Sequence, residues 1–204
     1  MSAQSLTSPN PLATALWPTQ AESSAQAALR FIALAIIGAA LLAISAKIRV
    51  PLPFTPVPMT LQTIAIMGLG AAYGMRLGLA TVLLYLAIGA LGMDVFTSST
   101  ADKNGLAYMM GGTGGYLVGF IIAMGVIGYF AERGWDRSIV KLFGLMLFAD
   151  AIIFGLGVLW LGNLVGWDKP VLEWGLYPFV VGDLIKIALA SALIPAIWTW
   201  LKRS

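Results

Sequence analysis

The chain consists of long apolar stretches separated by short polar connections. A helix that spans a bilayer needs about 20 mostly apolar residues, and six stretches approach or exceed this length. They run from Ala28 to Ala46, Met59 to Ala72, Met75 to Gly92, Gly111 to Ala131, Ile139 to Asn163 and Pro178 to Leu201. The pattern predicts an all-α polytopic membrane protein with six transmembrane helices. The second stretch is short, so we expect it to be tilted, partly re-entrant or buried among its neighbours.

The first 27 residues differ from the rest because they are polar and contain Pro9, Pro11 and Pro18. They lack the basic region and the small-residue cleavage site of a signal peptide. We therefore expect residues 1–27 to form a disordered or surface-lying tail. Residues 28–204 are expected to form a single six-helix membrane domain, because the apolar stretches follow one another almost without gaps.

Composition narrows the possible functions. Of the 204 residues, 59% are hydrophobic and 10% are charged, whereas a soluble domain has about 45–50% apolar and about 25% charged residues. A soluble enzyme is therefore excluded. The chain has no His and no Cys, which excludes His-based acid–base catalysis, Cys nucleophiles, disulfides and almost every zinc, haem or iron–sulfur site. We expect no catalytic residue, no metal site and no cofactor. The net charge of +3 comes without a basic cluster, so nucleic acid is not an expected partner.

The basic residues favour an orientation with both termini in the cytoplasm. With the N-terminus inside, seven basic residues lie inside and four outside, a modest bias that agrees with the positive-inside rule. The inside set is Arg30, Arg76, Arg133, Arg137, Lys141, Lys202 and Arg203, and the outside set is Lys47, Arg49, Lys103 and Lys169. The long connections 47–58 and 93–110 then lie outside, and connections of this kind commonly carry function.

The segment Val50–Thr63 has four prolines between Pro51 and Pro58. Proline fixes φ and cannot donate a backbone hydrogen bond, so this segment is expected to be stiff and extended. One interpretation is a simple connector between two helices. The number of prolines and the apolar side chains among them favour a second interpretation, a rigid lid folded over a cavity.

Small residues recur at helical spacing in three sets. The sets are Gly70, Gly74 and Gly78; Gly111, Gly115 and Gly119; and Ala35, Ala39 and Ala43. We interpret the glycine sets as packing contacts within the chain, since small residues let helices approach closely in lipid. The glycine-rich stretch 111–120 lacks a Lys-Ser/Thr partner and a preceding strand, so it does not predict nucleotide binding. If the face of the alanine set points outward, it forms a docking surface for another membrane protein.

Three ionisable residues lie within the apolar stretches, where a charge costs about 2.5–3.5 kcal/mol even on the mild insertion scale. Asp183 and Lys186 are three residues apart, which puts them on one face of a helix in the outer half of the membrane. The pair either neutralises itself so that the helix can insert, or forms a polar floor for a solute. Gly182 fits the second alternative, because a missing side chain makes room for a ligand. Asp150 has no obvious partner in its own stretch. We interpret it either as a structural residue or as one involved in coupling.

Four segments occur together in an order that is known from one family. They are VPLPFTPVPMTLQT (Val50–Thr63), LLYLAIGALG (Leu83–Gly92), GGTGGYLVGF (Gly111–Phe120) and PFVVGDLIK (Pro178–Lys186). With these segments the chain resembles the BioY family, the biotin-specific substrate-capture subunits of energy-coupling-factor vitamin transporters. The resemblance implies six helices with cytoplasmic termini in the bacterial cytoplasmic (inner) membrane, and high-affinity capture of biotin from outside.

The resemblance also implies partners. These are a transmembrane coupling protein, on which the Ala35, Ala39 and Ala43 ridge would dock, and ABC-type ATPase subunits. The absence of a phosphate-binding loop in this sequence agrees with a binding subunit that obtains its energy from elsewhere. The sequence leaves open whether the chain works without this module and whether it forms a homo-oligomer in the lipid bilayer.

The chemistry of biotin suggests roles for individual side chains. Asp183 can accept hydrogen bonds from the ureido N–H groups and Lys186 can donate one to the ureido oxygen. Their Cβ atoms are expected about 5–6 Å apart, so we assign both to the ureido end, with Lys186 at the carboxylate as an alternative. The remaining candidates are Arg49 or Lys47 as a charge for the carboxylate, Gln62 or Tyr85 as a hydrogen-bond partner, and Phe54, Phe96, Tyr116 and Trp160 as apolar walls. The family commonly has a Gly-x-Pro-Val-Phe run where this chain has Gly92–Phe96, and the loop 97–109 is longer and more polar than expected, which leaves contacts from this region open.

Two other functions remain as alternatives. One is a capture subunit for a different small vitamin. The other is an intramembrane enzyme, such as a lipid hydrolase that uses Asp150 and Asp183, although the sequence offers no His and no Ser nucleophile in a recognisable setting.

Overall fold

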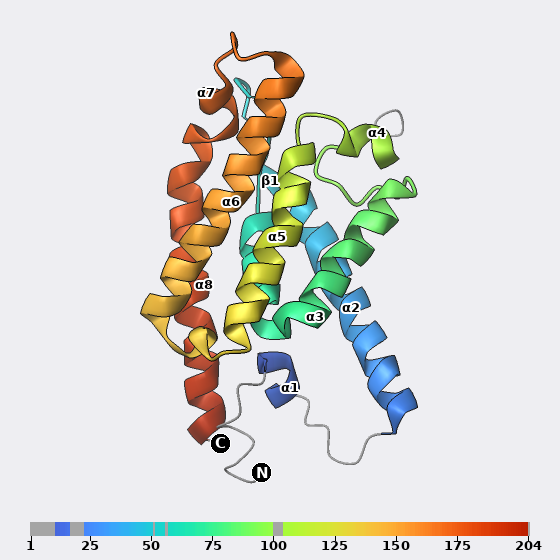
Figure 1. Ribbon diagram of the computed structural model, residues 1–204, viewed down its shortest axis with the longest axis vertical. Coiled ribbons are helices and arrows are strands. Elements are labelled where there is room, and N and C mark those ends of the chain that lie inside the picture. Colours follow the sequence, from blue (N-terminus) through green and yellow to red (C-terminus); the bar gives the residue numbers. More distant parts are fainter. Residues whose placement is uncertain (1–10, 17–22, 51, 56, 100–103, 204) are drawn as a thin grey trace.

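The computed structural model describes residues 11–16, 23–50, 52–55, 57–99 and 104–203. The long helices form an elongated bundle, and the short elements lie toward its two ends (Figure 1). In chain order the elements are α1 (Leu12–Leu16), α2 (Ser24–Lys47), β1 (Arg49–Val50), β2 (Met59–Thr60), α3 (Gln62–Ala90), α4 (Gly105–Met109), α5 (Gly114–Ala131), the 3-10 helix η2 (Trp135–Arg137), α6 (Ile139–Val165), α7 (Val171–Gly175) and α8 (Tyr177–Arg203).

In the part of the chain that the structure describes, five stretches are long and apolar enough to cross a membrane. They are α2, α3, α5, α6 and the stretch Val171–Leu201, which joins α7 to α8. The prediction of a helical, multi-pass membrane protein is confirmed. The predicted count of six is not confirmed, because two of the predicted stretches lie in one helix.

The two stretches that merge are the second and the third, and the merged helix α3 breaks at Gly74, where φ is 75° and ψ is −176°. The two halves of α3 are inclined to each other in a V (Figure 1). Glycine adopts positive φ without steric cost, and a Cβ atom at this position would lie 2.7 Å from Glu132 Oε1. Glu132 Oε1 accepts a hydrogen bond from the Met75 backbone N–H at 2.9 Å, which caps the second half of the helix.

The glycine sets bring neighbouring helices close together. Cβ atoms at Gly115 and Gly119 would lie 2.3 Å from Leu156 O and 2.7 Å from Ile153 Cα, so α5 and α6 approach backbone to backbone. Gly70 and Gly78 of α3 make room for the side chains of Ile127 and Met124 of α5. The interpretation of the glycine sets as packing contacts is confirmed at these four positions.

The alanine set points inward. Ala35 and Ala39 are 6% and 4% exposed, and Ala43 is partly buried. Between them, a Cβ atom at Gly38 would touch Thr81 and Tyr73 of α3, so this face of α2 packs on the chain's own third helix. The sequence predicted a docking surface only if this face of α2 pointed outward, and in this structure it does not.

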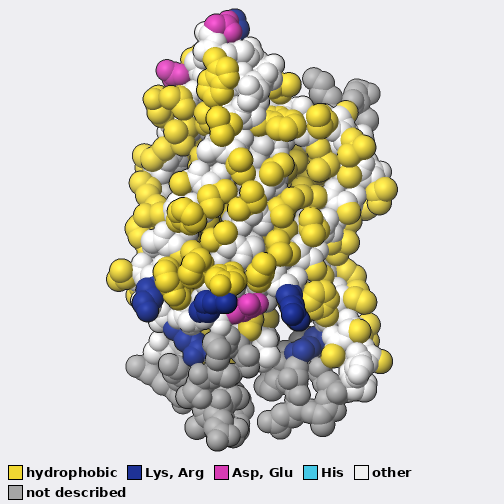
Figure 2. Space-filling view, viewed as in Figure 1, with side chains coloured by type: hydrophobic (Ala, Val, Ile, Leu, Met, Phe, Trp, Pro, Cys, Tyr) yellow, Lys and Arg dark blue, Asp and Glu magenta, His cyan; other side chains and the backbone are white. Residues whose placement is uncertain are grey.

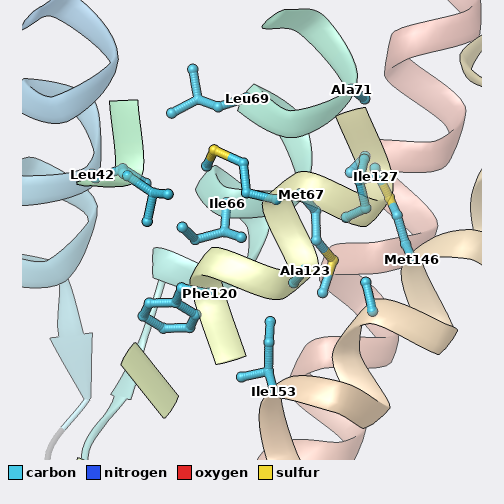
Figure 3. Packing of buried hydrophobic residues seen from close by; sticks show 14 of the residues in the cluster. Leu42, Ile66, Met67, Leu69, Ala71, Phe120, Ala123, Ile127, Met146 and Ile153 are labelled. Atoms are coloured by element: carbon cyan, nitrogen blue, oxygen red, sulfur yellow. The ribbon is translucent and has the colours of Figure 1, made fainter. Parts of the chain in front are cut away.

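A dense apolar core joins α3, α5 and α6 (Figure 3). Its fully buried members include Ile66, Met67, Met124, Ile127, Met146 and Ile153. Lipid tails are as apolar as these side chains, so van der Waals packing rather than transfer from water holds the helices together. Ile153 of this core also lines the cavity described below.

The surface has an apolar middle and charged ends. Hydrophobic side chains cover most of the face in Figure 2, and Lys and Arg side chains gather toward its lower end. The end of the bundle that holds α1 and the end of α8 (Figure 1) is also where α5 leads through η2 into α6, with Arg133, Arg137 and Lys141 in that stretch. The side chains of Lys202 and Arg203, which were part of the predicted inside set, lie outside the described residues.

Part of the predicted N-terminal tail is helical. Leu12 of α1 is buried against the bundle, and α2 begins at Ser24 with a capping box in which the side chains and backbone N–H groups of Ser23 and Gln26 bond reciprocally. The prediction of a disordered or surface-lying tail for residues 1–10 and 17–22 falls outside the described residues.

Candidate binding site

The polar pair of α8 is buried in the bundle. Lys186 Nζ donates to Asp183 Oδ1 at 2.7 Å, and the two side chains are 12% and 2% exposed. The helical spacing of three residues puts both on one face, as predicted. That face meets the start of α3 and the strand β2 that precedes it.

A backbone oxygen of β2 and a hydroxyl at the start of α3 hold this pair in place. Thr63 Oγ1 donates to Asp183 Oδ1 at 2.6 Å. Lys186 Nζ also donates to Thr60 O at 2.6 Å and lies 3.2 Å from Thr63 Oγ1. The three donors of the ammonium group therefore have partners, whereas Asp183 Oδ2 has no hydrogen-bond partner among the described residues.

The pair faces a cavity with about 550 Å³ of space between atoms, its open mouth included. The lining is mainly apolar and includes the aromatic side chains Phe96, Tyr108, Tyr116, Phe120, Phe154 and Phe179. An apolar chamber with one buried ion pair is suited to a small amphipathic solute.

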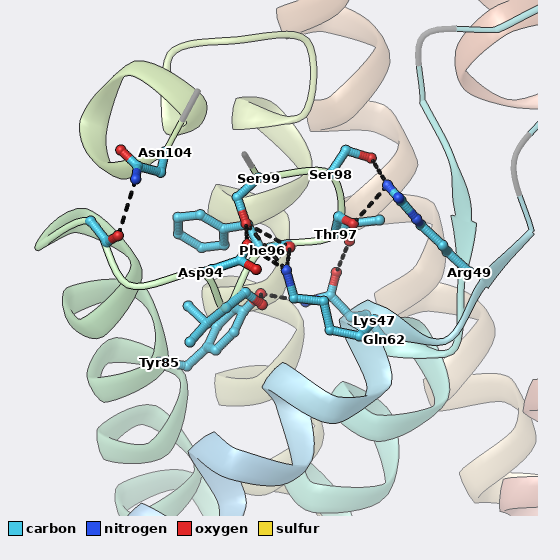
Figure 4. A network of polar contacts seen from close by, with 12 residues as sticks. Lys47, Arg49, Gln62, Tyr85, Asp94, Phe96, Thr97, Ser98, Ser99 and Asn104 are labelled. Atoms are coloured by element: carbon cyan, nitrogen blue, oxygen red, sulfur yellow. Dashed lines mark hydrogen bonds and ion pairs between the residues drawn. The ribbon is translucent and has the colours of Figure 1, made fainter. Parts of the chain in front are cut away.

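A second polar group lies on the cavity wall around Gln62 (Figure 4). Thr97 Oγ1 donates to Gln62 Oε1 at 3.1 Å, and Gln62 Nε2 donates to the Tyr85 hydroxyl at 2.8 Å. The Tyr85 hydroxyl in turn donates to Val95 O at 3.2 Å. Gln62 and Thr97 line the cavity, whereas Tyr85 does not line it and fixes the orientation of Gln62.

Lys47 and Arg49 lie outside the cavity lining and hold the loop after α3 (Figure 4). Lys47 Nζ donates to Asp94 Oδ1 at 2.6 Å and to Phe96 O at 2.7 Å. Arg49 donates to Thr97 O at 3.0 Å and to Ser98 Oγ at 2.6 Å. Hydrogen bonds from Lys47 and from a nearby serine lower the pKa of the Asp94 carboxyl. These two cations therefore position the wall that carries Phe96.

The proline segment contributes Val57 and Pro58 to the cavity lining, so the lid interpretation stays a prediction. The residues on either side of the segment form the short antiparallel ribbon of β1 and β2, in which Arg49 pairs with Thr60. The centre of the segment is tied to α7, because Thr55 Oγ1 donates to Trp174 O. Val57 is buried and lines the cavity, whereas Phe54 is 58% exposed and does not.

Of the remaining predicted site residues, one lines the cavity and two support neighbouring structure. Tyr116 lines the cavity and donates to Gly175 O at 2.7 Å. Trp160 is not in the lining and donates to Gly111 O at 2.9 Å. Gly182 makes room for Met59, whose sulfur would lie 3.3 Å from a Cβ atom there, rather than for a ligand.

Several lining residues were missed from the sequence. Thr63, Thr97 and Tyr108 line the cavity but were not singled out. Thr63 is a single hydroxyl near the start of an apolar stretch, and Thr97 and Tyr108 lie in the connection 93–110, whose contacts the sequence left open. For a metal ion, no group of three His, Cys, Asp or Glu side chains comes together in the described ranges. The cavity therefore offers a ligand hydrogen-bonding groups, an ion pair and apolar surface.

A family model described as the BioY family matches residues 19–203. The chain belongs to the BioY family. Among BioY proteins, it is 35% identical to the probable biotin transporter BioY of Pyrococcus horikoshii over 78% of this chain and 90% of that protein. It is also 35% identical to the biotin transporter BioY of Thermotoga maritima, over 76% of this chain and 87% of that protein. These relatives are transporters, which agrees with the expectation that the chain is not an enzyme.

The fold of this chain also occurs in a solved structure. A crystal structure described as the S-component for biotin from an ECF-type ABC transporter matches with a TM-score of 0.73 and 24% identity, over 87% of this chain and 94% of that one. The two chains therefore share a fold.

Three of the four BioY-like segments meet at the cavity. Val50–Thr63 includes the lining residues Val57 and Pro58 and the start of α3, Gly111–Phe120 leads into α5, and Pro178–Lys186 carries the ion pair; each contributes lining residues. Leu83–Gly92 does not line the cavity, but its Tyr85 accepts a hydrogen bond from Gln62, which does. The segment that departs from the usual BioY pattern, Gly92–Phe96, still brings Phe96 into the lining, where it stacks on Tyr108 with ring centroids 4.7 Å apart.

Proposed function

We propose that this chain binds biotin in the cavity beside Asp183 and Lys186 and acts as the capture subunit for biotin uptake. The observation that carries the proposal is a buried, hydrogen-bonded Asp–Lys pair on the wall of a mainly apolar cavity. The names of the relatives support biotin as the solute.

The ureido ring of biotin matches the pair in hydrogen-bonding chemistry. Asp183 Oδ2, which lacks a partner among the described residues, accepts a ureido N–H. Lys186 exchanges one of its present acceptors for the ureido oxygen. Hydrogen bonds that involve a charged group contribute about 1.5–3 kcal/mol each, so these two contacts supply a large part of a tight affinity.

The rest of the ligand matches the rest of the cavity. The thioether bicycle and the aliphatic tail pack against aromatic walls such as Tyr116 and Phe96. The carboxylate accepts a hydrogen bond from Gln62 or Thr97. Both groups lie on the loop side of the cavity, and Tyr85 keeps the Gln62 amide oriented.

The protein is further proposed to cross the cytoplasmic (inner) membrane six times, with both termini in the cytoplasm. The V-shaped break of α3 at Gly74 supports two crossings within this one helix. Basic residues near the end that holds α1 support that end as the cytoplasmic one. A transmembrane coupling protein and ABC-type ATPase subunits are the proposed partners, because the chain has no phosphate-binding loop of its own.

Titration of the purified chain in detergent with biotin tests the proposal. We expect saturable binding, and we expect Asp183→Asn and Lys186→Met each to weaken it by at least about tenfold, since each removes a charge-assisted hydrogen bond. Size-exclusion profiles that match the wild type show that each variant is folded. Unchanged affinity in both folded variants contradicts the assigned site.

A competition panel separates biotin from another vitamin. Unlabelled thiamine, riboflavin, folate and biotin are each added to the chain loaded with labelled biotin. We expect only biotin to displace the label at stoichiometric concentration. Displacement by a different vitamin at lower concentration than biotin transfers the proposal to that vitamin.

A further inference from the structure

Asp150 of α6 lies next to the proposed site but has no part in the binding described above. Ile153 and Phe154, three and four residues further along α6, line the cavity. Residues at this spacing share a helix face and are separated by about one turn, or about 5 Å along the axis. Asp150 therefore lies on the lining face of α6, one turn beneath the lining itself.

The charges next to Asp150 come from α8. It interacts electrostatically with both Asp183 and Lys186. The two helices pack side by side and run in opposite directions (Figure 1). The chain thus holds two carboxyl groups and one ammonium group together at the base of the cavity.

The hydrogen bonds of this cluster are unevenly distributed. Asp183 Oδ1 accepts from Thr63 and from Lys186. Asp150 Oδ1 is fully buried and has no hydrogen-bond partner among the described residues. The ammonium group has used its three donors on Thr60, Thr63 and Asp183, so it has none left for Asp150.

A buried carboxylate without a donor or a dedicated cation is strongly unfavourable, whereas a protonated carboxyl is not. Among the side chains that the structure describes, those of the other elements packed against α6 supply no compensating charge at this level. The ionisable ones are Tyr73, Arg76 and Tyr85 on α3, Tyr116 and Tyr129 on α5, Asp136 and Arg137 on η2, Glu173 on α7, and Tyr177 on α8, together with Lys141 on α6 itself. One cation and two acids balance only if one acid carries a proton.

We propose that Asp150 is that proton carrier and that biotin binding is linked to its protonation, an inference that rests on the proposed function. When Asp150 is ionised, Lys186 faces two competing carboxylates and is drawn away from Asp183. When Asp150 takes a proton from water, Lys186 stays on Asp183 and the pair keeps the geometry that meets the ligand. Asp150 is in this sense a positioning residue, and biotin binding and proton uptake favour each other reciprocally.

The linkage has a definite sign. Below the pH at which Asp150 ionises, the affinity for biotin is independent of pH. Above it, each binding event takes up one proton, so the dissociation constant rises by about tenfold per pH unit. Release of biotin is accordingly favoured where Asp150 can lose its proton.

Calorimetric titration of the full chain in detergent, from pH 5 to 9, measures the proton count. Paired buffers with different ionisation heats give the number of protons taken up with biotin. We expect the wild type to approach one proton at the upper end of this range, and Asp150→Asn to take up none and to bind with pH-independent affinity. The matched control is Asp136→Asn, because burial raises the pKa of Asp136 to about 6 although this residue lies at the far end of α6. We expect this variant to keep the wild-type proton count.

Three results overturn the inference: a wild type that takes up no proton, an Asp150→Asn variant that still does, or a loss of the uptake in Asp136→Asn. If Asp150→Asn fails to fold, infrared difference spectra of the wild type with and without biotin decide, since the inference requires a new protonated-carboxyl band above the ionisation pH. Biotin binding without proton uptake refutes this inference alone, whereas absence of biotin binding at every pH refutes the proposed function.

Discussion

Lys186 Nζ lies 2.7 Å from Asp183 Oδ1, one turn along the same helix, and the two side chains retain 12% and 2% of their exposure. Removing one member of a buried pair leaves an uncompensated charge and costs about 3–5 kcal/mol, whereas replacing both members is often neutral. Stability and binding should therefore respond differently to single and double substitutions at this pair.

The first prediction concerns this difference. We expect Lys186→Met to lower the thermal unfolding temperature clearly, because Asp183 is left buried with Thr63 as its donor. The double variant Asp183→Asn/Lys186→Met should regain much of that loss while biotin binding stays absent. Differential scanning fluorimetry in detergent and biotin titration measure the two effects. A double variant whose loss equals the sum of the single losses would show that the two charges do not stabilise each other.

The second prediction concerns Tyr85 as the support of Gln62. Tyr85→Phe removes the acceptor of Gln62 Nε2 and the donor to Val95 O. A buried polar group left without its partner costs about 1–3 kcal/mol, so we expect lower stability and several-fold weaker biotin binding. In a Gln62→Ala background, the same substitution should leave the affinity unchanged. An equal effect on affinity in both backgrounds would mean that Tyr85 does not act through Gln62.

The ion pair of α8 was predictable because it depends on local spacing alone. Positions 183 and 186 share a face in any helix, and the cost of charges in lipid singles them out. The contact of Asp183 with Thr63 joins residues 120 positions apart, so no local pattern contains it. The break of α3 fell between two predicted stretches, but the sequence alone did not show that Gly74 would carry it.

Three other features could not be predicted from the sequence pattern, each for a different reason. Lys47 and Arg49 were expected to serve a ligand, but the loop of residues 94–99 offers them carboxylate, carbonyl and hydroxyl acceptors that only tertiary structure brings near. The ribbon of β1 and β2 is too short to have a periodicity. The direction of Ala35 and Ala39 was undetermined, because a helix that is apolar on all sides shows no polar face from which to orient it.

The third prediction concerns the lid. Thr55 Oγ1 ties the proline segment to Trp174 O and accepts a hydrogen bond from the Val57 N–H at 3.1 Å. Thr55→Val keeps the shape of the side chain but removes both contacts, so we expect biotin to dissociate several-fold faster with a smaller change in the association rate. Thr55→Ser keeps the hydroxyl and serves as the control. Stopped-flow displacement measures the rates, and equal dissociation rates for the Val and Ser variants would contradict the lid.

The fourth prediction uses two glycines of the same helix. A Cβ atom at Gly157 would lie 2.3 Å from Tyr116 Cε1, whereas nothing lies within 4 Å of one at Gly155. Gly157→Ala must displace Tyr116 from the cavity wall and strain its hydrogen bond to Gly175 O. Overpacking of this kind costs about 1–3 kcal/mol, so we expect lower stability and weaker biotin binding. Gly155→Ala should leave both within error or raise stability slightly; similar losses in the two variants would show that the contact with Tyr116 is not the cause.

The fifth prediction concerns pH and the opposite end of the bundle. Asp136 is fully buried, accepts a hydrogen bond from Trp198 Nε1 and lies beside Arg137, whose guanidinium is 4.5 Å from the centre of the Trp198 ring. Burial raises the pKa of Asp136 from 3.8 to about 6, and the hydrogen bond from Trp198 offsets only part of this effect. Between these values the folded chain holds a proton that the unfolded chain has lost. The stability contributed by this group is therefore complete below pH 4 and falls as the pH rises to about 6.

Asp136→Asn should remove this loss, because the amide stays uncharged and keeps an oxygen that accepts from Trp198. We expect the unfolding temperature of the variant, relative to the wild type, to rise from pH 4 to 6 and to stay level up to pH 8. Asp94→Asn is the matched control, since hydrogen bonds lower the pKa of Asp94 and its substitution gives no such rise. A difference between Asp136→Asn and the wild type that is constant from pH 4 to 8 would mean that Asp136 has the same pKa in the folded and unfolded chains, and that the contact with Trp198 stabilises both of its protonation states equally.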